Sequence, residues 1–122
     1  YQMAGEVYDA CKDSGILCYG KYRDTSAMAP SVVLSSTQLL WDPSFKWMLA
    51  QWYDYKTNDT PFAGNTEAMW FSMADGGSDI SPYHDLDSRV PSDLKAQVKS
   101  VKADIIAGKI EVPLILDTPT SD

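Results

Sequence analysis

The sequence predicts an α/β fold with a parallel β-sheet, and three observations support this class. Apolar residues recur at helical spacing from Met3 to Cys11, and Gly15 follows as a residue that commonly ends helices. The apolar run Ile16–Tyr19 is typical of a short buried strand. After a polar loop, Val32–Thr37 is rich in β-branched residues and indicates a second strand. The order helix, strand, loop, strand is that of a parallel α/β layer.

The middle of the chain is expected to add a long helix and a third strand. Asp42-Pro43 predicts a helix start, with the acidic residue as cap and proline at the first helical position. The aromatic stripe in Phe45–Tyr55 is interpreted as packed core and not as a ligand site. Ala68–Met73 is predicted to be the third strand, with Trp70 in the core or a hinge. The turn Asp75-Gly76-Gly77 closes it, because glycine allows backbone angles that are closed to other residues.

The last part of the chain predicts one more helix and an extended end. Pro91 opens this helix and Gly108 ends it, and an apolar face recurs at steps of four, three and four residues: Leu94, Val98, Val101 and Ile105. Ile110–Leu116 is expected to be extended. We therefore predict one folded unit over residues 1–116 and a flexible tail over residues 117–122.

Composition excludes several classes of function. Acidic residues outnumber basic residues by 17 to 10, and no basic run is present, so the chain is not expected to bind nucleic acid. No apolar stretch approaches the roughly 20 residues that cross a bilayer. Tyr1–Glu6 lacks the features of a signal peptide, and the chain begins as if inside a helix. We interpret it as a fragment or processed product of an exported protein.

Candidate chemistry is sparse in this sequence. His84 and Asp85 could act as a base and its orienting carboxylate, but adjacent side chains rarely face each other and no nucleophile motif accompanies them. The histidine, cysteine and aspartate spacings match neither a zinc site nor a calcium loop, so no metal or other cofactor is expected. Cys11 and Cys18 could form a disulfide, although two buried free thiols are favoured. The chain is not expected to be an enzyme.

Five ordered pieces of the second half closely resemble the C-terminal portion of the basic membrane protein family. These pieces are Asp75-Gly76-Gly77, Ile80-Ser81-Pro82-Tyr83, His84-Asp85-Leu86-Asp87, Val90-Pro91 and Ile105–Ile110. Members are bacterial substrate-binding lipoproteins of ABC importers, related to the purine nucleoside receptor. Tyr8–Gly15, Ile16–Ser26 and Val33–Ser36 are similar to earlier elements of the family, so the resemblance spans nearly the whole chain.

The resemblance implies a two-lobed clamshell of the type I periplasmic-binding-protein class, of which this chain would be the C-terminal part. The ligand would bind between the lobes, at the carboxyl ends of strands, and closure would present a surface to the permease. The protein would be periplasmic or on the cell surface, anchored to the membrane by a lipid on a missing N-terminal portion. Its partners would be that portion, the permease and a small solute.

Four residues are expected to face the ligand: Tyr22, Asp24 and Leu39 by their position in the family pattern, and Trp41 as a further residue of the same cleft. Nucleoside-binding members have Gly-Val-Asp-x-Asp, and this chain has Tyr22 for the first aspartate while Asp24 matches the second. Leu39 replaces a lysine of the family. The aspartate and lysine that would bind ribose hydroxyls are thus absent. Their absence favours a free nucleobase or another flat heterocycle over a nucleoside as the ligand. Ordinary packing is the alternative role for Tyr22, Leu39 and Trp41, and a ligand-sensing regulatory protein with the same domain is the alternative function.

Overall fold

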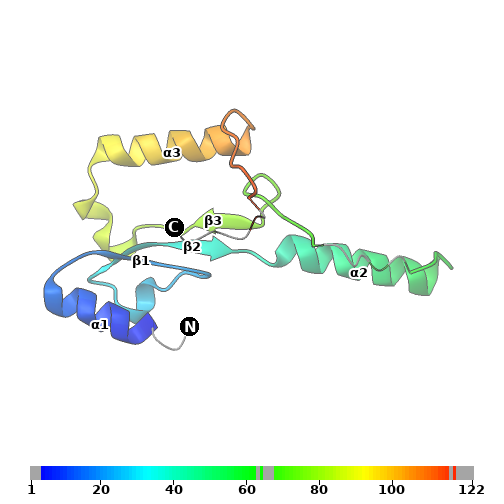
Figure 1. Ribbon diagram of the computed structural model, residues 1–122, viewed down its shortest axis with the longest axis horizontal. Helices are drawn as coiled ribbons and strands as arrows, with labels where there is room; N and C mark the ends of the chain where they lie inside the picture. Colours follow the sequence, from blue (N-terminus) through cyan, green and yellow to red (C-terminus); the bar gives the residue numbers. More distant parts are fainter. Residues whose placement is uncertain (1–3, 63, 65–67, 116, 118–122) are drawn as a thin grey trace.

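The computed structural model describes residues 4–62, 64, 68–115 and 117, which form helices around a small β-sheet (Figure 1). In this part of the chain the strands β1 (Cys18–Gly20), β2 (Val33–Leu39) and β3 (Ser78–Ile80) lie in the order β1-β2-β3. β1 and β2 run parallel, whereas β3 runs antiparallel to β2. The structure is therefore an α/β domain. The predicted parallel arrangement of the first two strands is confirmed, but the sheet as a whole is mixed because β3 is antiparallel.

The first half begins as the sequence predicts. The helix α1 (Ala4–Ser14) ends at Gly15, whose φ of +65° is readily adopted only by glycine. β1 begins later than predicted, and Ile16 and Leu17 before it are exposed instead of buried. β2 agrees with the second predicted strand, extended to Leu39. Between them lies a single turn of 3-10 helix, η1 (Ser26–Met28).

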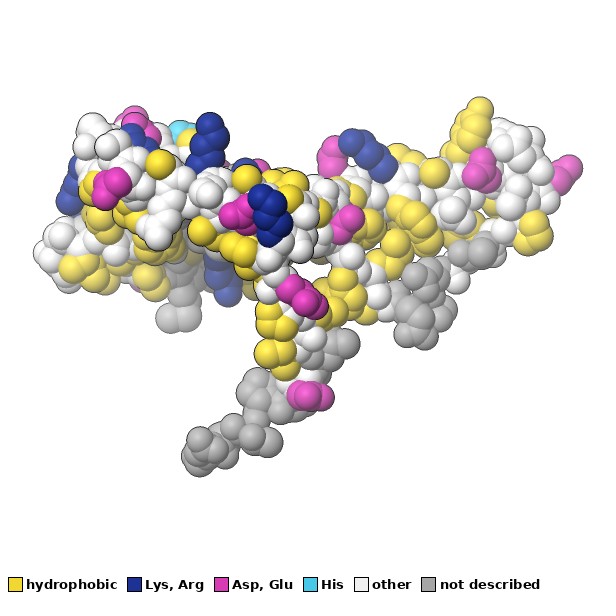
Figure 2. All heavy atoms as spheres, turned by 90° about the horizontal axis from the view of Figure 1, so that it is seen from above, with side chains coloured by type: hydrophobic (Ala, Val, Ile, Leu, Met, Phe, Trp, Pro, Cys, Tyr) yellow, Lys and Arg dark blue, Asp and Glu magenta, His cyan; other side chains and the backbone are white. Residues whose placement is uncertain are grey.

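The long helix α2 (Asp42–Thr57) projects away from the sheet, and none of its residues is buried (Figure 1). Trp41 occupies the cap position, so Asp42 is already inside the first turn and does not cap the helix as predicted. The aromatic stripe is exposed along the helix, with Trp52 53% accessible (Figure 2). The prediction of packed core was wrong, because an apolar helix face is buried only where another element covers it.

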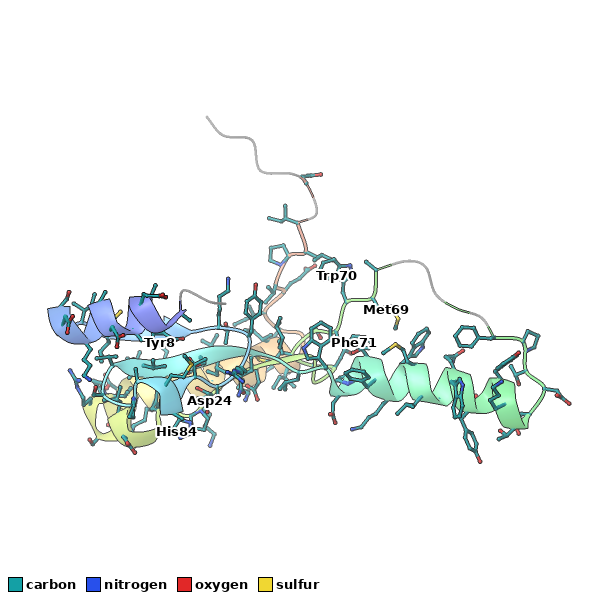
Figure 3. All side chains as sticks on the ribbon, turned by 90° about the horizontal axis from the view of Figure 1, so that it is seen from below. Tyr8, Asp24, Met69, Trp70, Phe71 and His84 are labelled. Atoms are coloured by element: carbon teal, nitrogen blue, oxygen red, sulfur yellow. The ribbon has the colours of Figure 1, made fainter. Side chains whose placement is uncertain are left out.

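The chain that returns from α2 to the sheet contains no strand at the predicted position. Residues 68–72 have no regular structure, and Trp70 is 61% exposed and not in the core (Figure 3). β3 follows later, in the polar segment after the glycine pair. The turn itself was predicted correctly: Gly76 has a φ of +76°, and the Gly77 amide donates to the carbonyl of Ser72 at 2.9 Å.

Two helical segments follow β3 in the described chain. The 3-10 helix η2 (His84–Arg89) leads through Pro91 into α3 (Ser92–Ile106), and Gly108 follows with a φ of +69°. The apolar face of α3 is only half covered: Leu94 and Val101 are exposed. Residues 111–115 have no regular structure. Leu116 and most of the predicted tail, residues 118–122, lie outside the described residues.

The buried centre combines apolar side chains with hydroxyl groups. The apolar members are Tyr8, Cys11, Val32, Val33, Leu86 and Val90, and the hydroxyl members are Thr25, Ser26, Ser35, Ser36 and Ser81. Within the described residues every buried side-chain nitrogen or oxygen has a hydrogen-bond partner. Because buried hydroxyls are costly unless they are bonded, this network specifies how the loops meet β2. None of the described helices combines the length and apolar character that spanning a membrane requires.

Candidate ligand-binding site

The carboxyl ends of the parallel strands β1 and β2 lie at one edge of the sheet and form the candidate site. Tyr22 follows β1, Leu39 ends β2, and the Leu39 amide donates to the Tyr22 carbonyl at 2.9 Å. Tyr22 has a φ of 73°, which is uncommon for a residue other than glycine. Such backbone angles persist only where surrounding contacts hold them, and they concentrate at functional sites. The structure thus brings two of the predicted site residues together through the backbone.

Beside Tyr22 lies a hollow of about 270 Å³, between the start of α1 and the end of β1. It is lined mainly by apolar and aromatic side chains: Ala4, Val7, Tyr8, Tyr19, Lys21, Tyr22, Thr25 and Met28. The ammonium of Lys21 lies 4.7 Å from the centre of the Tyr22 ring. The volume is close to the lower end of the range for small-molecule sites, roughly 300–1,000 Å³. The hollow can therefore accept a flat ring about the size of a nucleobase.

A chain of hydroxyl groups fixes the wall of this hollow. The Tyr8 hydroxyl shares a 2.8 Å hydrogen bond with Thr25 Oγ1, and Thr25 Oγ1 lies 3.2 Å from Ser36 Oγ. The Thr25 amide also donates to Ser36 Oγ at 3.2 Å. Gly20 makes this approach possible, since a Cβ there would lie 2.0 Å from Thr25 Oγ1 and 2.3 Å from Ser36 Oγ. The site thus depends on glycine at the end of β1.

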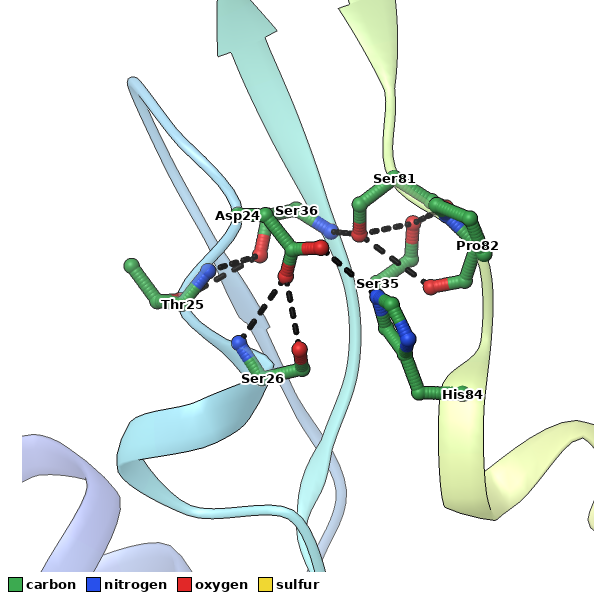
Figure 4. A network of polar contacts seen from close by, with 8 residues as sticks. All are labelled: Asp24, Thr25, Ser26, Ser35, Ser36, Ser81, Pro82 and His84. Carbon is green, nitrogen blue, oxygen red and sulfur yellow. Dashed lines mark hydrogen bonds and ion pairs between the residues drawn. The ribbon is translucent and has the colours of Figure 1, made fainter.

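Asp24 lies in the same loop, but its carboxylate is engaged within the protein. Asp24 Oδ1 accepts from the Ser26 amide at 3.0 Å and from the Ser26 hydroxyl at 2.7 Å. Its Oδ2 lies 2.6 Å from His84 Nε2 (Figures 3 and 4). Hydrogen bonds from the Ser26 backbone and hydroxyl hold the pKa of Asp24 below its ordinary value, against the effect of burial and with help from His84. Both carboxylate oxygens therefore already have partners.

Leu39 and Trp41 line a different and more open hollow, of about 520 Å³, near the start of α2. Asp42, Pro43, Lys46 and Asp75 lie around it, and Trp41 is 65% exposed. The four predicted residues therefore do not share one hollow. Tyr22 lines the one beside α1, Leu39 and Trp41 line the second, and Asp24 lines a third together with His84.

Sequence reasoning missed several residues of the first hollow. Tyr8 was noted only as one of the residues at helical spacing before Gly15. Tyr19 was expected to be buried in a strand, but it is exposed and lines the hollow. Thr25 was treated as part of a polar loop. The signal that could have pointed to them is Gly20 between the aromatic Tyr19 and Tyr22, because a glycine that ends a strand often permits close backbone approach.

The sequence also offered His84 with Asp85, possible metal ligands and the two cysteines as candidates for chemistry. His84 pairs with Asp24 and not with Asp85, and the Ser26 hydroxyl donates to Asp24 and not to the imidazole. The described part of the chain contains no cluster of three or more histidine, cysteine or acidic residues placed to hold a metal ion. Cys11 and Cys18 are free thiols, as favoured from the sequence, but only Cys11 is fully buried and Cys18 is partly exposed. Burial, followed by contacts with Cys11, raises the pKa of Cys18 to about 11.

Comparison with known proteins adds no assignment to this geometry. No protein-family model matches the chain, and no curated protein matches it.

Proposed function

We propose that this chain is part of an extracytoplasmic solute-binding protein of an ABC importer, and that it binds a purine-like base, a nucleoside or another small heterocycle. The observation that carries the proposal is the aromatic hollow beside Tyr22 at the carboxyl end of β1. Open α/β sheets bind ligands at this edge. The resemblance of residues 73–113 to the basic membrane protein family supports the class of protein.

The chemistry of the hollow favours a flat ring over a sugar. Tyr19 and Tyr22 offer aromatic faces for stacking, and Lys21 offers a hydrogen-bond donor at the rim. Ribose hydroxyls are best bound by a free carboxylate, but the described residues that line this hollow include no acidic side chain. Asp24 lines a different hollow, and both of its oxygens are bonded, to Ser26 and to His84. A nucleobase therefore fits these groups better than a nucleoside.

The exposed apolar surface supports the proposal of a second lobe. Large apolar side chains lie bare along α2 and the C-terminal segment, among them Phe45, Leu49, Trp52, Val112 and Ile115 (Figure 2). Apolar surface of this extent is typical of a surface that another part of a protein covers. In the proposed clamshell, the second lobe covers this surface, a lipid anchors the protein to the membrane, and closure over the solute is read by the permease.

Mass spectrometry of the protein at its natural length tests the proposal directly. Denaturing the purified protein should release a small molecule with the mass of a nucleobase or related heterocycle. Calorimetry with adenine, hypoxanthine, uracil and adenosine then ranks the ligands, and we expect a free base to bind most tightly. If nothing is released and none of the four binds, the proposal is wrong.

Tyr22→Ala should weaken binding by roughly tenfold or more, because stacking on one aromatic ring is worth about 1–3 kcal/mol per base. Tyr55→Ala is the matched control. Tyr55 and Tyr22 are both 45% exposed, and Lys56 lies 4.8 Å from the Tyr55 ring centre, much as Lys21 lies over Tyr22. Equal losses in the two variants would place the ligand elsewhere.

A further inference from the structure

The contact between Asp24 and His84 joins two segments that are 60 residues apart in the sequence. Asp24 belongs to the loop after β1, and His84 begins η2 (Figures 3 and 4). The side chains are partly accessible, 30% for Asp24 and 41% for His84. Since Asp24 Oδ1 also binds Ser26, this single carboxylate holds η1 with one oxygen and η2 with the other.

The loop between Tyr22 and Ser26 separates two hollows. Tyr22 and Thr25 line the aromatic hollow beside α1, whereas Asp24 and Ser26 line an open hollow of about 480 Å³ shared with His84. The loop is thus the wall of the proposed ligand site, and its far side is the surface that His84 contacts. Tyr22 precedes Asp24 by only two residues, so both side chains belong to one short segment of backbone.

The His84 end of this contact is firmly attached to the sheet. Ser81 precedes η2, and its amide donates to the Ser36 carbonyl at 2.8 Å, while its hydroxyl accepts from the Ser36 amide at 2.9 Å. His84 itself has a φ of 47°, and Tyr22 a φ of 73°. Both ends of the connection therefore have backbone angles that need support from surrounding contacts.

We infer that His84 is a positioning residue for the ligand site: through Asp24 it holds the loop Tyr22–Ser26 in the conformation that places Tyr22 at the aromatic hollow. This inference rests on the proposed function for its effect on affinity. His84 does not touch the hollow; its influence passes through the carboxylate of Asp24. Asp85 is the other charged side chain of the hollow on the far side of the loop.

The test compares His84→Ala with His84→Gln in the protein at its natural length. Both variants keep a Cβ at the same backbone angles, but glutamine retains a donor that can reach Asp24. His84→Ala should weaken binding of the tightest nucleobase by about three- to tenfold, the effect of losing a charge-assisted hydrogen bond at a partly exposed site. His84→Gln should restore most of the affinity. Asp24→Asn combined with His84→Ala should cost no more than the larger single change.

Lys95→Ala provides the matched control. It breaks the ion pair between Lys95 and Asp87, which has a length of 2.7 Å and also involves η2, but does not involve the loop. We expect it to leave the affinity unchanged. The inference is wrong if Lys95→Ala loses as much affinity for the nucleobase as His84→Ala does. It is also wrong if His84→Gln loses as much affinity as His84→Ala.

A second readout separates this inference from the proposed function. The amide resonances of residues 22–26 should shift in His84→Ala and return toward their normal positions in His84→Gln, with no ligand added. If no nucleobase binds the unmodified protein, the proposed function fails while these shifts still establish the loop contact. If the amide resonances do not move in His84→Ala, the positioning role is wrong whatever the ligand is.

Discussion

Ser36 and Ser81 bind each other through two hydrogen bonds at the point where the chain leaves β3. The Ser81 amide donates to the Ser36 carbonyl at 2.8 Å, and the Ser36 amide donates to Ser81 Oγ at 2.9 Å (Figure 4). Both residues are buried. A serine hydroxyl therefore takes the place of a backbone acceptor, and the pairing with β2 continues one residue beyond the end of β3.

Ser81→Ala should destabilise the fold by about 1–3 kcal/mol, because it leaves the buried amide of Ser36 without its acceptor. Chemical denaturation of the two proteins measures the difference. Ser100→Ala is the control, since Ser100 is exposed on α3 and a change there should stay within about 0.5 kcal/mol. If the free energy of unfolding falls no more in Ser81→Ala than in the control, a water molecule replaces the hydroxyl as the acceptor.

Gly20→Ala should destabilise the fold by about 1–3 kcal/mol, the usual cost of overpacking. The added Cβ would lie 2.0 Å from Thr25 Oγ1 and 2.3 Å from Ser36 Oγ, so the hydroxyl chain to Tyr8 must shift. Gly5→Ala should do the opposite. Gly5 lies in α1 with nothing within 4 Å of the added atom, and alanine favours a helix by roughly 0.5–1 kcal/mol. Thermal unfolding should show a lower melting temperature for Gly20→Ala and a higher one for Gly5→Ala. A shift in the same direction for both variants would contradict this prediction.

Local signals in the sequence predicted those elements whose ends are set by single residues. Gly15 and Gly108 end their helices with left-handed backbone angles, and Pro91 precedes α3. These features depend on the chain within a few residues, so pattern reasoning can find them. The β-branched content of β2 is likewise a local property, and β2 is the central strand.

The errors arose where distant contacts decide the structure. β3 is a polar segment of 3 residues, and its pairing with β2 rather than its composition makes it a strand. The apolar segment around Trp70 had the stronger strand signal but has no strand partner in the described chain. The aromatic stripe of α2 predicted burial, although a helix pattern cannot specify what covers it.

For the candidate site too, local signals could be predicted from the sequence and long-range contacts could not. Tyr22 could be placed near the edge of the sheet because it follows a strand end. Its separation from Trp41, and the engagement of Asp24 by His84, depend on how the loops fold back over the sheet. A pair of residues that are 60 positions apart leaves no pattern in a single sequence.

Trp52→Gln tests whether α2 is covered by anything in this chain. Replacing a large side chain in a packed core costs about 3–5 kcal/mol, whereas a change on an exposed face usually stays within about 0.5 kcal/mol. Trp52 is exposed, so we expect the free energy of unfolding of the 122-residue chain to be unchanged. Binding of an apolar dye should decrease. A large loss of stability would show that the stripe is packed, as its pattern alone suggests.

Stability should fall in acid through Asp79, which joins β3 to α3. Asp79 Oδ1 lies 2.5 Å from Lys102 Nζ. Burial opposes ionisation of this carboxyl, but the hydrogen bond from Lys102, the amide of Ile80 and the charge of Lys102 together hold its pKa below the ordinary value of 3.8. A pKa that is lower in the folded state than in the unfolded state means that the unfolded chain binds the proton more tightly. The contribution of Asp79 is therefore complete above the ordinary pKa and is lost as the pH falls through the lower folded value.

Asp79→Asn should remove this part of the acid dependence. Denaturation between about pH 7 and pH 3 should give a smaller decrease in the free energy of unfolding for the variant than for the unmodified protein, because the amide does not titrate. Asp93→Asn is the control, since Asp93 is exposed in the first turn of α3 and has no part in the Lys102 contact. Asp24 and Asp75 also have lowered pKa values, so some acid sensitivity should remain in every variant. A profile for Asp79→Asn that is parallel to that of the unmodified protein would mean that the contact with Lys102 does not persist in solution.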